Sequence, residues 1–155
     1  MKRFLLFLAF ILIFIALGIV QQDLLRLRSR YPDMKVVFYT TDANAAQNHN
    51  SIFDGVYYEV TCAAKDAKKV KSALDEIKGM SVSFWGTQKD IDYILDYYRV
   101  KVAFETSQDQ ILYVYGYSDL ISIPAVKVGE DYINIQLALR RNTVVVGAPF
   151  ILGSI

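Results

Sequence analysis

The stretch YINIQLALR (132–140), followed by TVVVGAPF (143–150), decides which fold the chain is expected to adopt. Its first half places aliphatic side chains at every second position: Ile133, Ile135, Leu137 and Leu139. The positions around them hold Tyr132, Asn134, Gln136, Ala138 and Arg140. Alternation with a period of two is typical of a β-strand that is buried on one side. We therefore expect the aliphatic set to face a core and the second set to face outward.

The second half of this stretch predicts a strand that is more fully buried. Residues 144–146 are consecutive valines. Gly147 and Pro149 then end the strand, because Pro has no N–H to donate to a ladder. Arg141 and Asn142 form the turn between the halves, and Asn142 is suited to a positive φ. The tail is thus predicted to be a β-hairpin with a structural role.

Several upstream segments also have the composition of strands. GVYYEVTC (55–62) alternates, which predicts burial of the face that carries Val56, Tyr58, Val60 and Cys62. The other expected strands are KVVFYT (35–40), SVSFWG (81–86), VKVAFE (100–105), QILYVYGYS (110–118) and AVKVG (125–129). A turn is expected at Glu130 and Asp131, and the polar stretch 40–51 is expected to be a flexible loop.

Two segments switch to the period of an α-helix. KDAKKVKSALDEIKG (65–79) ends with Gly79 as a candidate C-terminal cap. Its apolar stripe is Ala67, Val70, Leu74 and Ile77. TQKDIDYILDYYR (87–99) begins with Thr87 and Asp90, which resemble a capping box. Its apolar stripe is Ile91, Ile94, Leu95 and Tyr98. Two helices among many strands predict an α+β domain with an antiparallel sheet and both helices on one face.

The N-terminal segment from Phe4 to Val20 contains no charged residue, and Lys2 and Arg3 precede it. Its length is near the lower limit for a transmembrane helix, roughly 17–25 residues, and exceeds the core of a signal peptide, roughly 7–15 residues. This favours an uncleaved membrane anchor, although the small residues of 16–18 leave a cleaved signal as the alternative. We expect an anchor or signal segment at 1–22, a juxtamembrane linker at 23–34 and an extracytoplasmic α+β domain at 35–155.

Basic residues flank both ends of the apolar segment, so the positive-inside comparison is close to a tie. A short basic region that leads into an apolar run favours export of the downstream chain. The expected location is therefore the cell membrane, with a single pass and the C-terminal domain outside the cytoplasm. The arginines beyond the segment either contact anionic headgroups or lie in a solvated turn: Arg26, Arg28 and Arg30.

Charge and residue counts exclude several functions. From Gln21 onward there are 15 Lys and Arg against 16 Asp and Glu, a formal charge of −1. No basic field is predicted to attract nucleic acid. The single cysteine, Cys62, excludes an intrachain disulfide and a Cys-based zinc cluster, and an inert buried thiol is expected. We expect no metal and no cofactor.

Catalytic chemistry finds little support in the sequence. The one histidine, His49, lies in the polar loop, where a solvated side chain is expected. Asp92 and Asp96 share a helix face, but a solvated charged face is the ordinary explanation for such a pair. We expect no catalytic residue and no enzyme.

The same tail resembles the C-terminal end of the YwmB family of exported proteins. Its pattern is close to Asn-x-Gln-Ile-Ala-Leu-Arg, then Thr-Val-x-Val-Gly-Thr-Pro. The matching residues here are Asn134, Gln136, Ala138, Leu139, Arg140, Thr143, Val144, Val146, Gly147 and Pro149. Leu137 and Ala148 depart from the pattern. The resemblance implies an extracytoplasmic, curved antiparallel sheet backed by helices, like the TATA-box-binding-protein fold, and it implies no catalytic residues.

Two functions remain from different classes. The first is a non-enzymatic binding or assembly module of the cell envelope, whose partners are membrane lipid through the N-terminal helix and an envelope protein or cell-wall polymer. The second is a cell-envelope hydrolase that uses carboxylates. Aromatic rings with polar tips favour sugars or extended peptides. The candidate binding face comprises Tyr57, Tyr113, Tyr115, Tyr117, Tyr132, Asn134, Gln136 and Arg140. In the alternative arrangement, the tyrosines of 113–117 pack beneath the helices.

Overall fold

The computed structural model describes residues 23–152. The predicted anchor at 1–22 lies outside these residues. Within residues 23–152, no helix is both long and apolar enough to cross a membrane.

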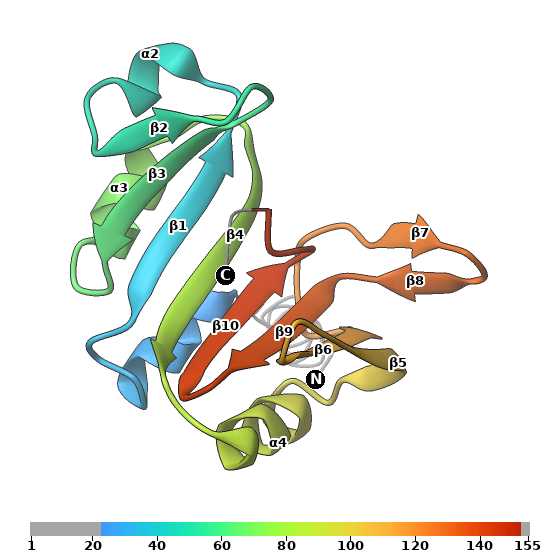
Figure 1. Cartoon of the computed structure of the whole chain (residues 1–155). Helices are drawn as coiled ribbons and strands as arrows, with labels where there is room; N and C mark the ends of the chain where they lie inside the picture. The colour runs from blue at the N-terminus through green and yellow to red at the C-terminus, as the bar shows by residue number, and fades with distance from the viewer. Residues whose placement is uncertain (1–22, 153–155) are drawn as a thin grey trace, which may run out of the picture.

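The domain is built on one antiparallel sheet of eight strands (Figure 1). From one edge to the other, its strands are β2 (Ser51–Phe53), β3 (Tyr58–Ala63), β1 (Lys35–Thr40), β4 (Ile77–Trp85), β10 (Thr143–Ala148), β9 (Ile135–Arg140), β6 (Ile111–Tyr117) and β5 (Lys101–Gln108). The short strands β7 (Val126–Val128) and β8 (Asp131–Ile133) form a separate hairpin that projects from the body. The α+β class with a large antiparallel sheet is confirmed.

The helical elements pack against one face of the sheet. They are the 3-10 helix η1 (Leu24–Ser29) and the α-helices α2 (Ala43–Ala46), α3 (Ala67–Ala73) and α4 (Gln88–Tyr97). A single core joins buried residues of η1, α3 and α4 to the strands, and it includes Leu27, Val70, Ile91, Val82 and Leu137. In Figure 1, η1 and α3 lie behind the sheet. The segment 23–34, expected as a linker, thus contributes buried leucines to the core.

Helix α4 agrees with its sequence signals. Thr87 and Asp90 form the predicted capping box, with the Thr87 N–H donating to the Asp90 carboxylate at 2.8 Å. Ile91, Ile94 and Tyr98 are fully buried. Local capping and an apolar stripe were sufficient to predict this helix.

The first predicted helix is too long and is corrected by the structure. Helix α3 ends at Ala73, and Ile77 and Gly79 belong to β4 instead. Leu74, directly after α3, has an extended backbone with φ −101° and ψ 129°, which ends the helix before Ile77. A Cβ on Gly79 would lie 3.0 Å from the carbonyl oxygen of Ala148, so this glycine permits close approach of strands rather than a helix cap. The hydrophobic spacing of this segment favours a helix, but pairing with distant strands places its last residues in the sheet.

Smaller differences concern loops and turns. The predicted loop at 40–51 contains the one-turn helix α2, which begins where the Asp42 side chain accepts from the Ala45 N–H at 3.0 Å. In the β9–β10 turn, Arg141 rather than Asn142 takes the positive φ. The β7–β8 turn falls one residue earlier than expected, at Gly129 and Glu130. Val56, expected on a buried face, is exposed because it precedes β3.

The expected outward set of the C-terminal stretch is only partly outward. Tyr132 and Arg140 are exposed, but Asn134, Gln136 and Ala138 are buried. Asn134 separates β8 from β9, and its amide bonds to both the N–H and the carbonyl of Ser118 at 2.8 Å. Ala138 lies in the ladder between the larger Val145 and Tyr113. Strand β9 is therefore covered on both faces, and simple alternation does not describe it.

Candidate functional site

The face of the sheet opposite the helices carries part of the predicted binding face. Directly paired residues of an antiparallel sheet point to the same side. Tyr113 and Tyr115 pair with Ala138 and Gln136, and these two tyrosines do not join the helix-covered core. Their strand neighbour Val114 belongs to that core. Tyr113 and Tyr115 thus lie on the side away from the helices.

Three rings form a continuous aromatic row on that side: Phe104, Tyr115 and Tyr113. The centroids of Phe104 and Tyr115 are 4.6 Å apart, and those of Tyr115 and Tyr113 are 6.4 Å apart. The amide of Gln136 donates to the Tyr115 hydroxyl at 3.1 Å. Burial, followed by the influence of Tyr113, raises the pKa of Tyr115 above its usual value. The row therefore combines the apolar ring of Phe104 with two tyrosine rings that carry polar hydroxyls.

Of the remaining members of the predicted face, Tyr117 follows Tyr115 by two residues on β6, and the others lie apart from this row. Tyr57 precedes β3 near the opposite edge of the sheet, where Asp54 accepts from its N–H at 2.7 Å. Tyr132 is exposed on the β7–β8 hairpin. Asn134 is committed to the main chain of Ser118. Tyr117 and Arg140 lie toward opposite ends of β6 and β9. The structure brings together Tyr113, Tyr115 and Gln136, whereas Phe104 was not predicted.

The C-terminal segment lies across the same face. After β10, the chain folds back so that the Ile151 N–H donates to the side-chain oxygen of Gln136 at 3.0 Å. The backbone of Phe150 and Ile151 also approaches Gly147 closely. In Figure 1, the described residues after β10 turn back from the end of this strand toward β4. Gln136 thus connects the aromatic row to the tail.

Replacement of this amide should have a measurable cost. We expect Gln136→Ala to lower the free energy of unfolding by about 1–2 kcal/mol, since the bonds to Tyr115 and Ile151 are both lost. Gln108→Ala, on the exposed edge strand β5, is the matched control and should change little. Urea unfolding of the chain in mild detergent measures both. Equal losses at the two positions would show that the Gln136 bonds contribute nothing.

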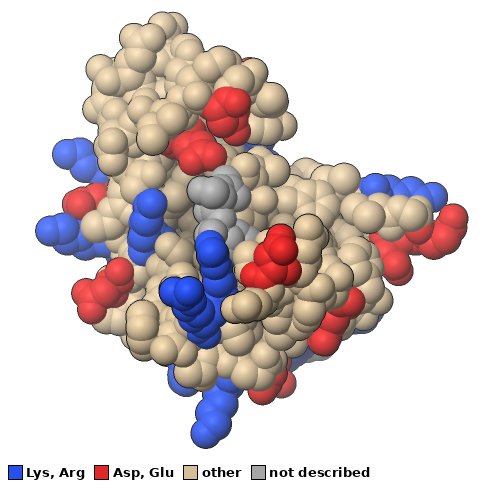
Figure 2. All heavy atoms as spheres, viewed as in Figure 1, with Lys and Arg blue, Asp and Glu red and all other residues tan. Residues whose placement is uncertain are grey.

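On the side of the sheet that faces the viewer in Figure 1 and in Figure 2, positively and negatively charged side chains are scattered among the other residues. For the described part of the chain, this view contains no continuous basic field of the kind that binds nucleic-acid phosphates.

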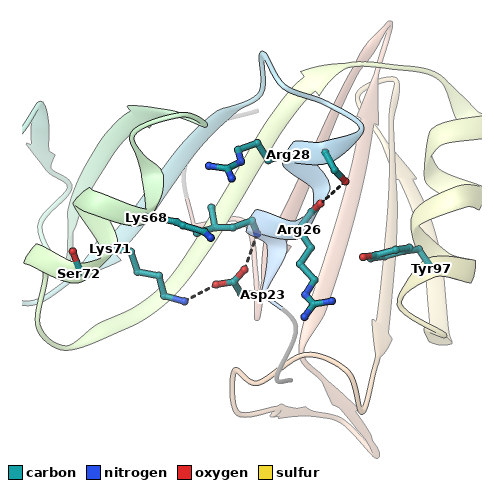
Figure 3. Close-up of a pocket in the computed structure, with 9 residues that line it drawn as sticks. Asp23, Arg26, Arg28, Lys68, Lys71, Ser72 and Tyr97 are labelled. Atoms are coloured by element: carbon teal, nitrogen blue, oxygen red, sulfur yellow. Dashed lines mark hydrogen bonds and ion pairs between the residues drawn. The ribbon is translucent and has the colours of Figure 1, made fainter. Parts of the chain in front are cut away.

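A second candidate site lies on the helical side, between η1 and α3. It is a pocket of about 860 Å³ (Figure 3). Its lining is Asp23, Leu25, Arg26, Arg28, Ser29, Lys68, Lys71, Ser72 and Tyr97. Figure 3 shows Lys68 and Lys71 on α3 facing η1, which carries the two arginines. We refer to this site as the basic pocket.

Asp23 fixes the geometry of the basic pocket. One carboxylate oxygen accepts from the Leu25 N–H at 3.0 Å and caps η1. The other forms an ion pair with Lys71 at 2.6 Å. Its main-chain oxygen accepts from the hydroxyl of the buried Tyr98 at 3.0 Å. These bonds join the start of the described chain to both α3 and α4.

The pocket holds an excess of positive charge. Four cations and one carboxylate line it, which gives 4 − 1 = +3. Between residues 23 and 152, the ion pairs are Lys71–Asp23 and Lys78–Glu76. Arg26, Arg28 and Lys68 therefore have no carboxylate partner in this range. The sequence showed these cations, but it gave no signal that two segments some forty residues apart would meet.

Groups suited to catalysis do not converge in the described residues. There, no three His, Cys, Asp or Glu side chains lie close enough to hold a metal ion. Asp92 accepts from Gln88 on the exposed face of α4. Burial would raise the pKa of Asp90, but hydrogen bonds from Thr87 and Tyr31 lower it. A general acid needs the opposite shift, so Asp90 offers no support for a hydrolase.

The thiol of Cys62 should react slowly. It is half-buried instead of fully buried, and burial, followed by the charge of Asp66, raises its pKa from 9.0 to about 11. Because the thiolate is the nucleophile, we expect alkylation by iodoacetamide at pH 8 to be about 100-fold slower than for a peptide thiol. The same chain unfolded in urea is the control. A folded rate equal to the unfolded rate would contradict the shift.

No family model, no curated protein and no solved structure matches this chain. The structure itself defines an α+β protein with an antiparallel sheet, an aromatic row on one side and a basic pocket among the helices on the other.

Proposed function

We propose that the chain is a membrane-anchored, extracytoplasmic binding or assembly module of the cell envelope, without enzymatic activity. In this proposal, Phe4 to Val20 crosses the membrane once and the folded domain lies outside the cytoplasm. The uncharged segment and the basic residues that precede it support this arrangement. We also propose that the domain is YwmB-like with a TATA-box-binding-protein-like sheet. The antiparallel sheet with helices on one face supports that relationship.

The aromatic row is the observation that carries the binding function. Phe104, Tyr113 and Tyr115 are stacked side by side outside the helix-covered core. Stacked aromatic rings, two of them with polar hydroxyls, suit the faces of sugar rings or an extended peptide. We propose a cell-wall polymer or an envelope protein as the partner of this row, and membrane lipid as the partner of the anchor.

A sedimentation assay with purified cell-wall polymer tests the binding function. The double variant Phe104→Ser/Tyr113→Ser removes two rings and leaves the Tyr115–Gln136 hydrogen bond in place. We expect it to fold and to lose most of its binding. The control is Ile52→Ser/Phe53→Ser, which removes exposed apolar side chains from the edge strand β2. If both variants bind like the unmodified chain, the aromatic row is not the site of polymer binding.

Membrane extraction tests the anchor separately. We expect the chain to stay in the membrane pellet after washing at alkaline pH and to require detergent for release. Its measured mass should include residues 1–22. A soluble chain with a new N-terminus near Ile19 would show a cleaved signal instead. Labelling of Asn48→Cys by an impermeant reagent in intact cells should succeed if the domain is outside.

A further inference from the structure

We infer that the basic pocket is a binding site for the phosphate headgroup of an anionic phospholipid. This inference rests on the proposed function, because it requires the segment Phe4 to Val20 to lie in the membrane. It deepens that function by assigning a lipid contact to the folded domain in addition to the apolar segment.

The first argument is the position of the pocket along the chain. Asp23 lines the pocket and follows Val20 by three residues. An extended chain spans at most about 3.3–3.6 Å per residue, so the two are at most about 11 Å apart. The bonds from Asp23 to Lys71 and Tyr98 hold the pocket at this point. A chain that leaves the bilayer at Val20 therefore places the pocket at the level of the headgroups.

The second argument is the chemistry of the cations. Arg26 and Arg28 both line the pocket from η1, and Figure 3 shows Arg28 on the side of Lys68 and Arg26 pointing toward the Tyr97 side. A guanidinium group can bind two phosphate oxygens at once. Lys68 approaches from α3 as a point charge. Asp23 neutralises Lys71, which leaves the other three cations for a ligand. From Gln21 onward the chain has a formal charge of 15 − 16 = −1. The positive charge of the basic pocket is therefore opposite in sign to the net charge of this part of the chain.

The third argument is the aromatic border of the pocket. Tyr97 lines it and stacks on Tyr93, with ring centroids 5.7 Å apart. The guanidinium of Arg30 lies 4.0 Å from the centroid of the Tyr93 ring. Tyrosines are enriched at the membrane–water interface, where their rings contact the acyl boundary and their hydroxyls stay hydrated. Cations and tyrosines together suit the headgroup layer better than a fully aqueous site.

The test measures lipid affinity of the full chain in dodecyl maltoside micelles by native mass spectrometry. Phosphatidylglycerol is titrated against phosphatidylcholine, and inorganic phosphate is added as a competitor. The double variant Arg28→Gln/Lys68→Gln removes two unpaired cations of the pocket. The control, Lys101→Gln/Lys127→Gln, removes the same charge from exposed positions on β5 and β7.

We expect the unmodified chain and the control to prefer phosphatidylglycerol. The pocket variant should bind it about 25-fold more weakly, at about five-fold for each cation near a membrane surface. Equal affinity of the pocket variant and the control would overturn the inference. Displacement of the lipid by an equal concentration of inorganic phosphate would also overturn it, since the site would then take a soluble anion. Alkaline extraction distinguishes the two failures: release of the chain refutes the anchor, whereas a retained chain with equal affinities refutes the pocket alone.

Discussion

Leu137→Ala should lower the free energy of unfolding by about 2–5 kcal/mol. Leu137 is fully buried on β9, opposite Val146 on one neighbouring strand and Val114 on the other. All three belong to the helix-covered core. Truncation to Ala removes apolar contacts and leaves a cavity that rigid strands on both sides cannot close. The urea concentration at the midpoint of unfolding, with an unchanged slope, measures this loss.

Leu139→Ala provides a chemically identical control on the same strand. Leu139 is only partly buried and packs at the border of the core, so its truncation should cost clearly less. Reversal of this order would show that the core lies at the Arg140 end of the strand. The pair therefore tests the position of the core along β9 as well as its face.

The sequence was most informative where the deciding interactions are local. Helix α4 begins with a capping box whose two residues are three positions apart, and its buried stripe is formed by its own turns. Strand β1 agrees with the predicted segment at both ends. Such elements can be predicted because each residue needs only its near neighbours to favour one conformation.

The sequence-based predictions were wrong where contacts between distant segments determine the local structure. Ile77 continues the helical stripe and Gly79 suits a helix cap, but Ile77 pairs with Thr40 and Gly79 pairs with Tyr39 on β1. Gln136 has an outward position in the alternation, but the main chain of Ile151 covers and bonds it. Nothing in either local pattern reports these partners. In a sheet whose strands pair over long distances in the sequence, hydrophobic periodicity therefore cannot predict every strand boundary or every buried polar residue.

The same limit applies to the candidate sites. Tyr113 and Tyr115 could be placed on one face because they lie on one strand. Phe104 comes from the neighbouring strand, and its stacking on Tyr115 depends on a register that the sequence does not specify. The basic pocket combines η1 with α3, and only the folded chain places Arg28 near Lys68. Composition alone argued against a nucleic-acid site, a Cys-based zinc site and a disulfide. Which residues come together in a site depends on contacts between distant segments.

Gly147→Ala should destabilise the fold by about 3 kcal/mol, near the top of the range for overpacking. A Cβ at this position would lie 2.5 Å from the Ile151 nitrogen and 2.5 Å from the Phe150 carbonyl carbon. Both are main-chain atoms, so no side-chain rotation can relieve the contact. Either β10 shifts against its neighbours, or the tail leaves the sheet and the Ile151–Gln136 hydrogen bond breaks.

A shortened chain that ends at Pro149 separates these outcomes. It lacks the atoms that the new methyl group would meet, so Gly147→Ala should cost little in this background. The difference between the two costs is the coupling energy between Gly147 and the tail, obtained from urea unfolding of the four chains. Equal costs in the full and shortened chains would mean that the tail does not lie on Gly147. A coupling near 3 kcal/mol would instead show that a glycine is required because the tail crosses the sheet there.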